Sequence, residues 1–325
     1  MSDMQEYNPD IIPEKDLSAQ ESTAVNDYVA TAPKPLISEG WLRALLYFFA
    51  FFLTLIITQG ISFALLMSIT GMPATELGEY LETSPELAPL TLLQFITLLG
   101  LLVQTWLFCR FIDKRSMYDL GFAYKGFVRD GLKGIGVGIG LISVGFVLLW
   151  LLGFLRINGL NFSPSVLLGS AFLCIIIALN EEIFIRGYIL NNLMKSINPY
   201  AALGISSLLF SLMHVLNPNI GIISGINIVL AGVLLGVYYI FKKNLWFPIG
   251  LHFAWNFFQG PILGFEVSGL NLQGIVAQTV SGSPLVTGGD FGFEGSLMLT
   301  LLLLAAIAWV HKQYAPPTAD KQQSM

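Results

Sequence analysis

The sequence predicts an all-α, polytopic transmembrane helix bundle of about eight spans with both termini in the cytoplasm. Hydrophobic residues make up 54% of the 325-residue chain and charged residues only 11%, whereas soluble domains usually carry about 25% charged residues. Mean hydropathy is +0.70. The net charge of −5 and the lack of a basic stripe exclude a nucleic-acid-binding protein. We therefore expect membrane lipid, and no nucleic acid, as a partner.

Eight apolar stretches are candidates for these spans, because a membrane-spanning helix needs about 20 mostly apolar residues. The first is long enough to tilt or kink, and the fifth is short and rich in small residues. The stretches are 42–69, 88–111, 132–154, 166–190, 199–216, 220–241, 246–264 and 295–311.

The distribution of Lys and Arg orients the bundle, because basic residues gather in the cytoplasmic loops of membrane proteins. Loops 71–88 and 265–294 contain no Lys or Arg and are expected outside. Of the basic residues near the spans, Arg156 is expected on the outer side and Arg186 inside a span. The loops and tail expected inside hold Arg110, Lys114, Arg115, Lys125, Arg129, Lys133, Lys195, Lys242, Lys243, Lys312 and Lys321. A wrong span count would scramble this alternation.

The chain divides into four regions. Residues 1–40 are polar and acidic and are expected to be a disordered tail without a signal peptide. Residues 41–164 hold the N-terminal transmembrane helices, and 165–262 hold the polar residues considered next. Residues 263–325 comprise a Gly-rich extracytoplasmic loop, the last span and the C-terminal tail. We expect loop 265–294 to be flexible, with a partly re-entrant cap as the alternative.

Two adjacent carboxylates, Glu181 and Glu182, stand inside an apolar span, and Arg186 follows them. Each ionisable side chain at membrane depth costs at least about 2.5 kcal/mol, so the three must pair, line a wet cavity or do chemistry. Glu182 and Arg186 are four residues apart and can pair on one helix face. Glu181 is rotated by about 100° from Glu182. One carboxylate is thus neutralised while Glu181 stays available.

Two histidines extend this polar set. Phe210 and His214 are four residues apart in the fifth span, and His252 and Asn256 are four apart in the seventh. Glu181 could act as a general base on water, and His214 could hold the same water or shuttle a proton. His252 and Asn256 could donate hydrogen bonds to an oxygen that becomes negative. These groups suit amide hydrolysis without a covalent intermediate. The alternative is that they only bind helices together, which we favour for the Glu182–Arg186 pair but not for the set.

The segments EEIFIR (181–186), FSLMH (210–214) and HFAWN (252–256) resemble the EExxxR, FxxxH and HxxxN motifs of the CPBP family. This is the CAAX-protease and bacteriocin-processing (Abi) family, which includes the type II CAAX prenyl endopeptidases. The segment VTGGDFGFEGS before the last span is similar to a Gly-rich segment of bacterial members. The resemblance implies an intramembrane endopeptidase. It assigns water activation to Glu181 with help from His214, oxyanion stabilisation to His252 and Asn256, and supporting roles to Glu182, Arg186 and Phe210.

The resemblance also bears on the cofactor and the substrate. It favours a glutamate-activated water without an obligatory metal. Zinc held by Glu181, His214 and His252 is the alternative, because two His and one Glu can bind this metal, although the chain has no HExxH motif. The implied substrate is a membrane-associated peptide or protein, either of CAAX type or a precursor. We expect a multi-pass protein of the bacterial inner membrane.

Other functions fit the sequence less well. A non-enzymatic bacteriocin-immunity or scaffold protein of the same family is the first alternative, although the motif set is intact. A transporter is less favoured, because the sequence has no inverted repeat and no paired broken helices. The rhomboid-like GxSxG is absent, since 221–225 reads GIISG. An intramembrane aspartyl pair is disfavoured because only Glu181 and Glu182, of all acidic residues, lie well inside a span.

Overall fold

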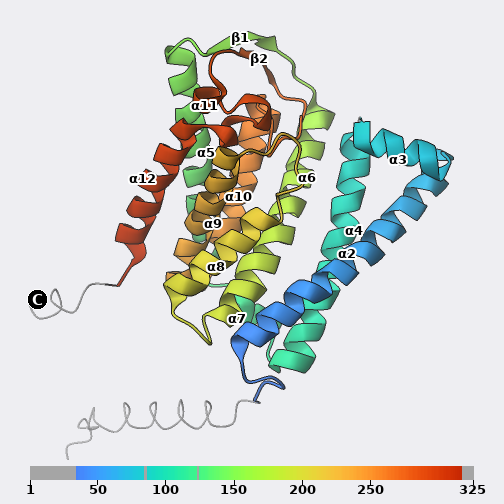
Figure 1. Ribbon diagram of the computed structural model, residues 1–325, viewed down its shortest axis with the longest axis vertical. Coiled ribbons are helices and arrows are strands. Elements are labelled where there is room, and N and C mark those ends of the chain that lie inside the picture. The colour runs from blue at the N-terminus through green and yellow to red at the C-terminus, as the bar shows by residue number, and fades with distance from the viewer. Residues whose placement is uncertain (1–33, 84–85, 123, 317–325) are drawn as a thin grey trace, which may run out of the picture.

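A computed structural model describes residues 34–83, 86–122 and 124–316. Most of the predicted disordered tail, residues 1–33, lies outside this range, as do residues 317–325. Within the described part the chain is mostly helical (Figure 1). The prediction of an α-helical bundle is therefore confirmed, apart from one small two-stranded sheet.

Six helices among the described residues are long and apolar enough to cross a membrane. Two of them continue beyond their α-helical part: α4 into the π-helix η1 (Phe108–Asp113), and α6 into the π-helix η3 (Ile183–Leu190) and α7 (Asn191–Leu193). The six are α2 (Gly40–Thr70), α4 (Leu87–Leu107), α5 (Phe127–Leu151), α6 (Pro164–Glu182), α9 (Ile222–Lys242) and α12 (Leu297–Tyr314).

The other two predicted spans are helical but shorter. Helix α8 (Pro199–Leu212) has 14 residues, and α10 (Trp246–Phe257) has 12, followed by the π-helix η4 (Phe258–Ile262). Helix α10 packs against α5, α6 and α9, so its sides contact protein rather than lipid. The count of eight spans and the cytoplasmic placement of both termini stay predictions.

Helices α2 and α4 form a pair on one side of the bundle, joined by α3 (Ala74–Thr83) (Figure 1). The pair packs on the rest of the molecule through α4, which lies against α6, and through α2, which contacts η3 and α7. Outward-facing positions of α2 are apolar and exposed, as for Phe49 and Ile56. Exposed apolar side chains around a helix pair are typical of a surface that faces lipid.

At the end of the bundle away from the small two-stranded sheet, a buried carboxylate joins α2, η1 and η3. Asp113 Oδ1 accepts from Arg43 Nη1 at 2.9 Å and from Tyr188 Oη at 3.2 Å. Asp113 Oδ2 accepts from Arg115 Nε at 2.9 Å. These bonds fix the π-helical stretch that follows Glu182.

The Gly-rich segment before α12 forms a folded cap over the other end of the bundle. Strand β2 (Val276–Val280) pairs antiparallel with β1 (Leu155–Leu160), and α11 (Pro284–Thr287), η5 (Gly289–Phe291) and η6 (Phe293–Gly295) follow. The rings of Phe291 and Phe293 are buried, with Phe293 against the bare backbone of Gly145. The segment therefore corresponds to the capping alternative and not to the flexible loop expected, because its aromatic side chains anchor it.

Candidate active site

The pair predicted from helix spacing is present and buried. Arg186 Nη1 lies 2.8 Å from Glu182 Oε1, and both side chains are at most 1% exposed. Arg186 also donates from Nη2 to the Gly232 carbonyl at 3.2 Å, and its guanidinium lies 4.3 Å from the centre of the Phe210 ring. Phe210 thus contacts the supporting arginine as well as the predicted histidine. The predicted pairing of Glu182 with Arg186 is confirmed.

The helix changes its winding immediately after the two carboxylates. Helix α6 ends at Glu182, and the π-helix η3 begins at Ile183. Wider π-helical turns occur often at functional sites, because they rotate the side chains that follow. Here the change separates the α-helical Glu181 and Glu182 from Arg186, which still reaches Glu182.

Glu182 has a second partner that the sequence did not reveal. His252 Nδ1 lies 2.8 Å from Glu182 Oε1, the oxygen that also binds Arg186. This contact ties α6 to α10. The two residues are 70 positions apart in the chain, so no local spacing could have predicted it.

Hydrogen bonds fix the tautomers of both histidines. His214 Nδ1 lies 2.8 Å from the carbonyl oxygen of Phe210, and His252 Nδ1 faces the Glu182 carboxylate that is paired with Arg186. A carbonyl or an ionised carboxylate only accepts hydrogen bonds, so each Nδ1 must carry the hydrogen. The Nε2 atom of each neutral ring is therefore an acceptor.

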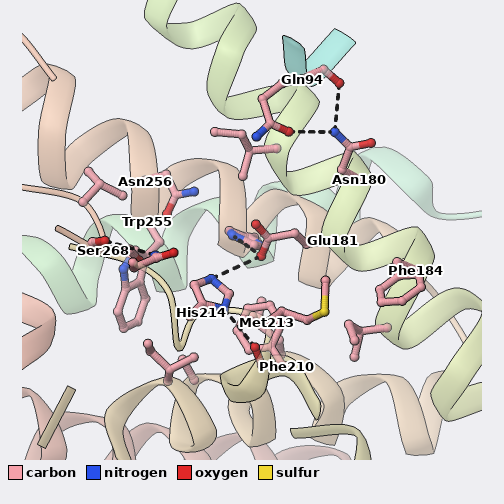
Figure 2. A pocket seen from close by; sticks show the side chains of 18 of the residues that line it. Gln94, Asn180, Glu181, Phe184, Phe210, Met213, His214, Trp255, Asn256 and Ser268 are labelled. Atoms are coloured by element: carbon pink, nitrogen blue, oxygen red, sulfur yellow. Dashed lines mark hydrogen bonds and ion pairs between the residues drawn. The ribbon is translucent and has the colours of Figure 1, made fainter. Parts of the chain in front are cut away.

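Both of these Nε2 atoms face Glu181, and Figure 2 shows the His214 ring turned toward the Glu181 carboxylate. Glu181 Oε2 lies 3.8 Å from His214 Nε2 and 3.7 Å from His252 Nε2. This oxygen is buried and has no hydrogen-bond partner in the described part of the chain, while the Glu181 side chain as a whole is 30% exposed. Three acceptor atoms that converge in this way need a proton or a water molecule between them. The site is thus built to hold and move protons.

A cavity of 320 Å³ opens beside these groups. Glu181, Phe210, His214, His252 and Asn256 line it, whereas Glu182 and Arg186 lie behind its wall. The Asn256 carboxamide is 7% exposed and has no hydrogen-bond partner among residues 34–83, 86–122 and 124–316. Three helices and the turn after α8 therefore bring the predicted residues together around one space, with the supporting pair outside it.

Comparison with known proteins identifies the segment that holds all seven residues. Residues 162–258 match the family model described as type II CAAX prenyl endopeptidase Rce1-like. The chain carries an Rce1-like domain. No curated protein and no solved structure matches the chain. The Rce1-like family is a peptidase family, and with six apolar helices the protein is an integral membrane protein.

A second carboxylate borders the cavity, and it lies outside the Rce1-like domain. Glu294, in the cap, accepts from Trp255 Nε1 at 2.8 Å and from Ser268 N and Oγ at 2.6 and 2.8 Å. Trp255 precedes Asn256, so Glu294 links the cap to the helix that presents the carboxamide. The Gly-rich segment around Glu294 is recognisable in the sequence, but the glutamate itself is not, because no motif residue lies at helical spacing from it.

The zinc alternative would place the metal within the Rce1-like domain, on Glu181, His214 and His252. In a tetrahedral zinc site neighbouring ligand atoms are about 3.3 Å apart, and the two distances from Glu181 Oε2, 3.7 and 3.8 Å, are wider. No group of three or more His, Cys, Asp or Glu side chains in the described ranges is arranged to hold a metal ion. These donor atoms thus lie further apart than in a formed zinc site, and a reaction without an obligatory metal stays a prediction.

Proposed function

We propose that the protein is an intramembrane endopeptidase that hydrolyses a peptide bond of a membrane-associated peptide or protein with water activated by Glu181. One observation carries the proposal. Of two adjacent carboxylates, Glu182 is neutralised by Arg186 behind the cavity wall, and Glu181 faces two imidazoles inside the cavity. A free carboxylate beside two imidazoles in a partly desolvated space is suited to general-base catalysis.

In the proposed reaction Glu181 takes a proton from water, and the oxygen of that water forms a bond to the carbonyl carbon of the substrate. His214 orients the water through Nε2, because its Nδ1 is held by the Phe210 carbonyl. The carbon–nitrogen bond then breaks, and the leaving amine takes the proton held by Glu181 or His214. No covalent intermediate with the protein is formed.

The tetrahedral intermediate carries a negative oxygen, which we assign to His252 and Asn256. At this stage Glu181 holds the proton taken from water, so Arg186 and a His252 imidazolium balance the charges of Glu182 and the negative oxygen. The imidazolium then donates from Nε2 into the cavity, while Nδ1 stays on Glu182. Asn256 donates from its free carboxamide. Each such donor is worth about 10²–10³ in kcat in other hydrolases.

The proposed substrate has an apolar flank next to the scissile bond. Away from the polar groups, the cavity is lined by Phe51, Leu55, Ile177 and Phe184. The description of the matching family names CAAX prenyl substrates, and a prenylated or strongly apolar precursor peptide suits this wall. We propose no obligatory metal, and a location in the bacterial inner membrane.

The test compares wild type with Glu181→Gln, which keeps the shape of the side chain but cannot take a proton. One substrate is an internally quenched farnesylated peptide ending in Cys-Ala-Ala-Xaa, and a comparative membrane proteome of the two strains supplies native candidates. Glu181→Gln should lose at least about 10³ in kcat, whereas Glu76→Gln, in α3, should keep wild-type activity.

Full activity of Glu181→Gln would remove the base assignment. The alternatives give different results in the same strains. An immunity or scaffold protein would keep its phenotype in Glu181→Gln, and a transporter would show Glu181-dependent ion flux in proteoliposomes.

A further inference from the structure

Polar side chains from α2 and α4 line the cavity on the wall that the Rce1-like domain does not supply. Gln59 and Gln94 both border it, and both lie outside residues 162–258. An amide group in an apolar helix is costly unless its donors and acceptors are satisfied. Each of these two glutamines is satisfied at one end only.

Gln94 is held by its oxygen. Asn180 Nδ2 donates to Gln94 Oε1 at 3.1 Å and to the Gln94 carbonyl at 3.0 Å. Asn180 directly precedes Glu181, and Figure 2 shows the pair beside that carboxylate. Gln94 Nε2 has no partner among the side chains and backbone that the structure describes. The open end of Gln94 is thus a hydrogen-bond donor.

Gln59 is held by its nitrogen. Gln59 Nε2 donates to Thr97 Oγ1 at 2.9 Å, and Thr97 Oγ1 donates to the Leu93 carbonyl at 2.9 Å. Gln59 Oε1 has no partner within the described residues. The open end of Gln59 is thus an acceptor. Thr97, which anchors Gln59, lies three residues after Gln94, about 4.5 Å further along α4, so the two glutamines are held on neighbouring turns of that helix.

We propose that Gln59 and Gln94 bind the main chain of the substrate in an extended conformation. An extended strand presents carbonyl and N–H groups along one edge, and one fixed donor and one fixed acceptor match such an edge. Gln94 Nε2 would donate to a substrate carbonyl, and Gln59 Oε1 would accept from a substrate N–H. Phe51 and Leu55 flank them on α2 and suit apolar substrate side chains.

A nearby glutamine shows how the chain builds a purely structural contact. Gln104 Oε1 accepts from Thr54 Oγ1 at 2.7 Å, and Gln104 Nε2 donates to the Tyr47 carbonyl at 2.9 Å. Gln104 is 5% exposed and satisfied at both ends. It joins the same two helices without bordering the cavity, which makes it the matched control for the two open glutamines.

The inference rests on the proposed function, so its test uses the same farnesylated peptide. Gln59→Leu and Gln94→Leu should each raise KM about tenfold and change kcat less than twofold, because tenfold is about 1.4 kcal/mol, within the usual worth of one hydrogen bond. Gln104→Leu should lower thermal stability and leave KM unchanged. The peptide is also made with single esters, each replacing one N–H near the scissile bond.

At one position, replacing the peptide N–H by an ester oxygen should lower kcat/KM of wild type about tenfold. The same ester should not lower kcat/KM of Gln59→Leu any further, because this variant already lacks the acceptor. If wild type binds but does not cleave the peptide, the same comparison is made on Kd. No ester position with this coupling, or Leu variants that match Gln104→Leu in KM, would overturn the main-chain site alone. An active Glu181→Gln would overturn the proposed function alone. Wild type that neither cleaves nor binds the peptides would overturn both.

Discussion

His252 Nδ1 and Glu182 Oε1 lie 2.8 Å apart, and the same carboxylate oxygen lies 2.8 Å from Arg186 Nη1. Glu182 Oε1 thus accepts one hydrogen bond from Arg186, one turn further along the same helix, and another from His252 on α10. The contact gives physical content to the supporting role expected for Glu182. It holds the His252 ring so that Nε2 points at Glu181, and it connects α10 to the buried ion pair.

Glu182→Gln should therefore lower both stability and activity. Removing the charge leaves Arg186 buried and unpaired, which costs about 3–5 kcal/mol, and His252 loses the carboxylate that orients it. We expect a marked drop in the thermal midpoint in detergent and at least a tenfold loss of kcat in the variant that remains folded.

The double variant Glu182→Gln/Arg186→Met separates these two effects. It removes both buried charges, so most of the stability should return. The loss of kcat should persist, because His252 still lacks its carboxylate. Near-wild-type kcat in the folded double variant would show that Glu182 acts only through the ion pair.

The sequence predicted the contacts that depend on helix spacing. The residues of the pairs Glu182–Arg186 and Phe210–His214 are each four positions apart. The first pair forms within the stretch of α6 and η3, and the second forms between α8 and the turn that follows it. It also predicted that Glu181 would remain unpaired by arginine. Such contacts depend only on the geometry of one helix, so they do not depend on how the other helices pack.

Contacts between distant parts of the chain could not be predicted in this way. The bond between Glu182 and His252 and the three bonds to Glu294 depend on how helices and cap pack together. Helix α8 is shorter than the predicted span 199–216, and α10 packs against α5, α6 and α9; hydropathy alone does not distinguish a helix packed in protein from one that crosses lipid. The cap was expected to be flexible because it is rich in glycine. The sequence did not show that the side chains of Phe291 and Phe293 are buried and anchor it.

The close approach of α5 and α10 should be sensitive to a single methyl group. A Cβ at Gly134 would overlap the Phe247 carbonyl oxygen and lie 2.8 Å from Leu251 N, both backbone atoms of α10. Gly134→Ala should push α10, and His252 with it, away from α5. We expect destabilisation by about 1–3 kcal/mol and reduced kcat, measured by thermal unfolding and peptide cleavage.

Gly136→Ala is the control on the same helix, because nothing lies within 4 Å of a Cβ at that position. It should leave both stability and activity at wild-type values or raise stability slightly. Equal effects of the two substitutions would contradict the packing explanation.

Glu294→Gln should loosen the cap without removing it. The glutamine amide can accept with one atom only, so either Trp255 Nε1 or the two Ser268 donors lose their partner, at a cost of about 1–3 kcal/mol. Hydrogen exchange should rise around Ser268, and kcat should fall severalfold because Trp255 precedes Asn256. Glu266→Gln is the control, since the Glu266 carboxylate has no hydrogen bond or ion pair with the part of the chain described; equal exchange in both variants would contradict this role for Glu294.

Activity should survive removal of metal. The distances of 3.7 and 3.8 Å from Glu181 Oε2 to the two Nε2 atoms are too long for direct hydrogen bonds and suit a bridging water better than a zinc ion, whose ligands lie closer together. We therefore expect phenanthroline to leave cleavage of the farnesylated peptide unchanged, with elemental analysis of the purified protein showing less than stoichiometric zinc.

The two histidine variants, His214→Ala and His252→Ala, give a stronger test of the metal alternative. Glutamate-activated water predicts that both variants lose activity with no change in bound metal, whereas a zinc site predicts that each loses metal and activity together. Stoichiometric zinc in wild type, lost in parallel with activity, would replace the carboxylate by the metal as the group that activates water.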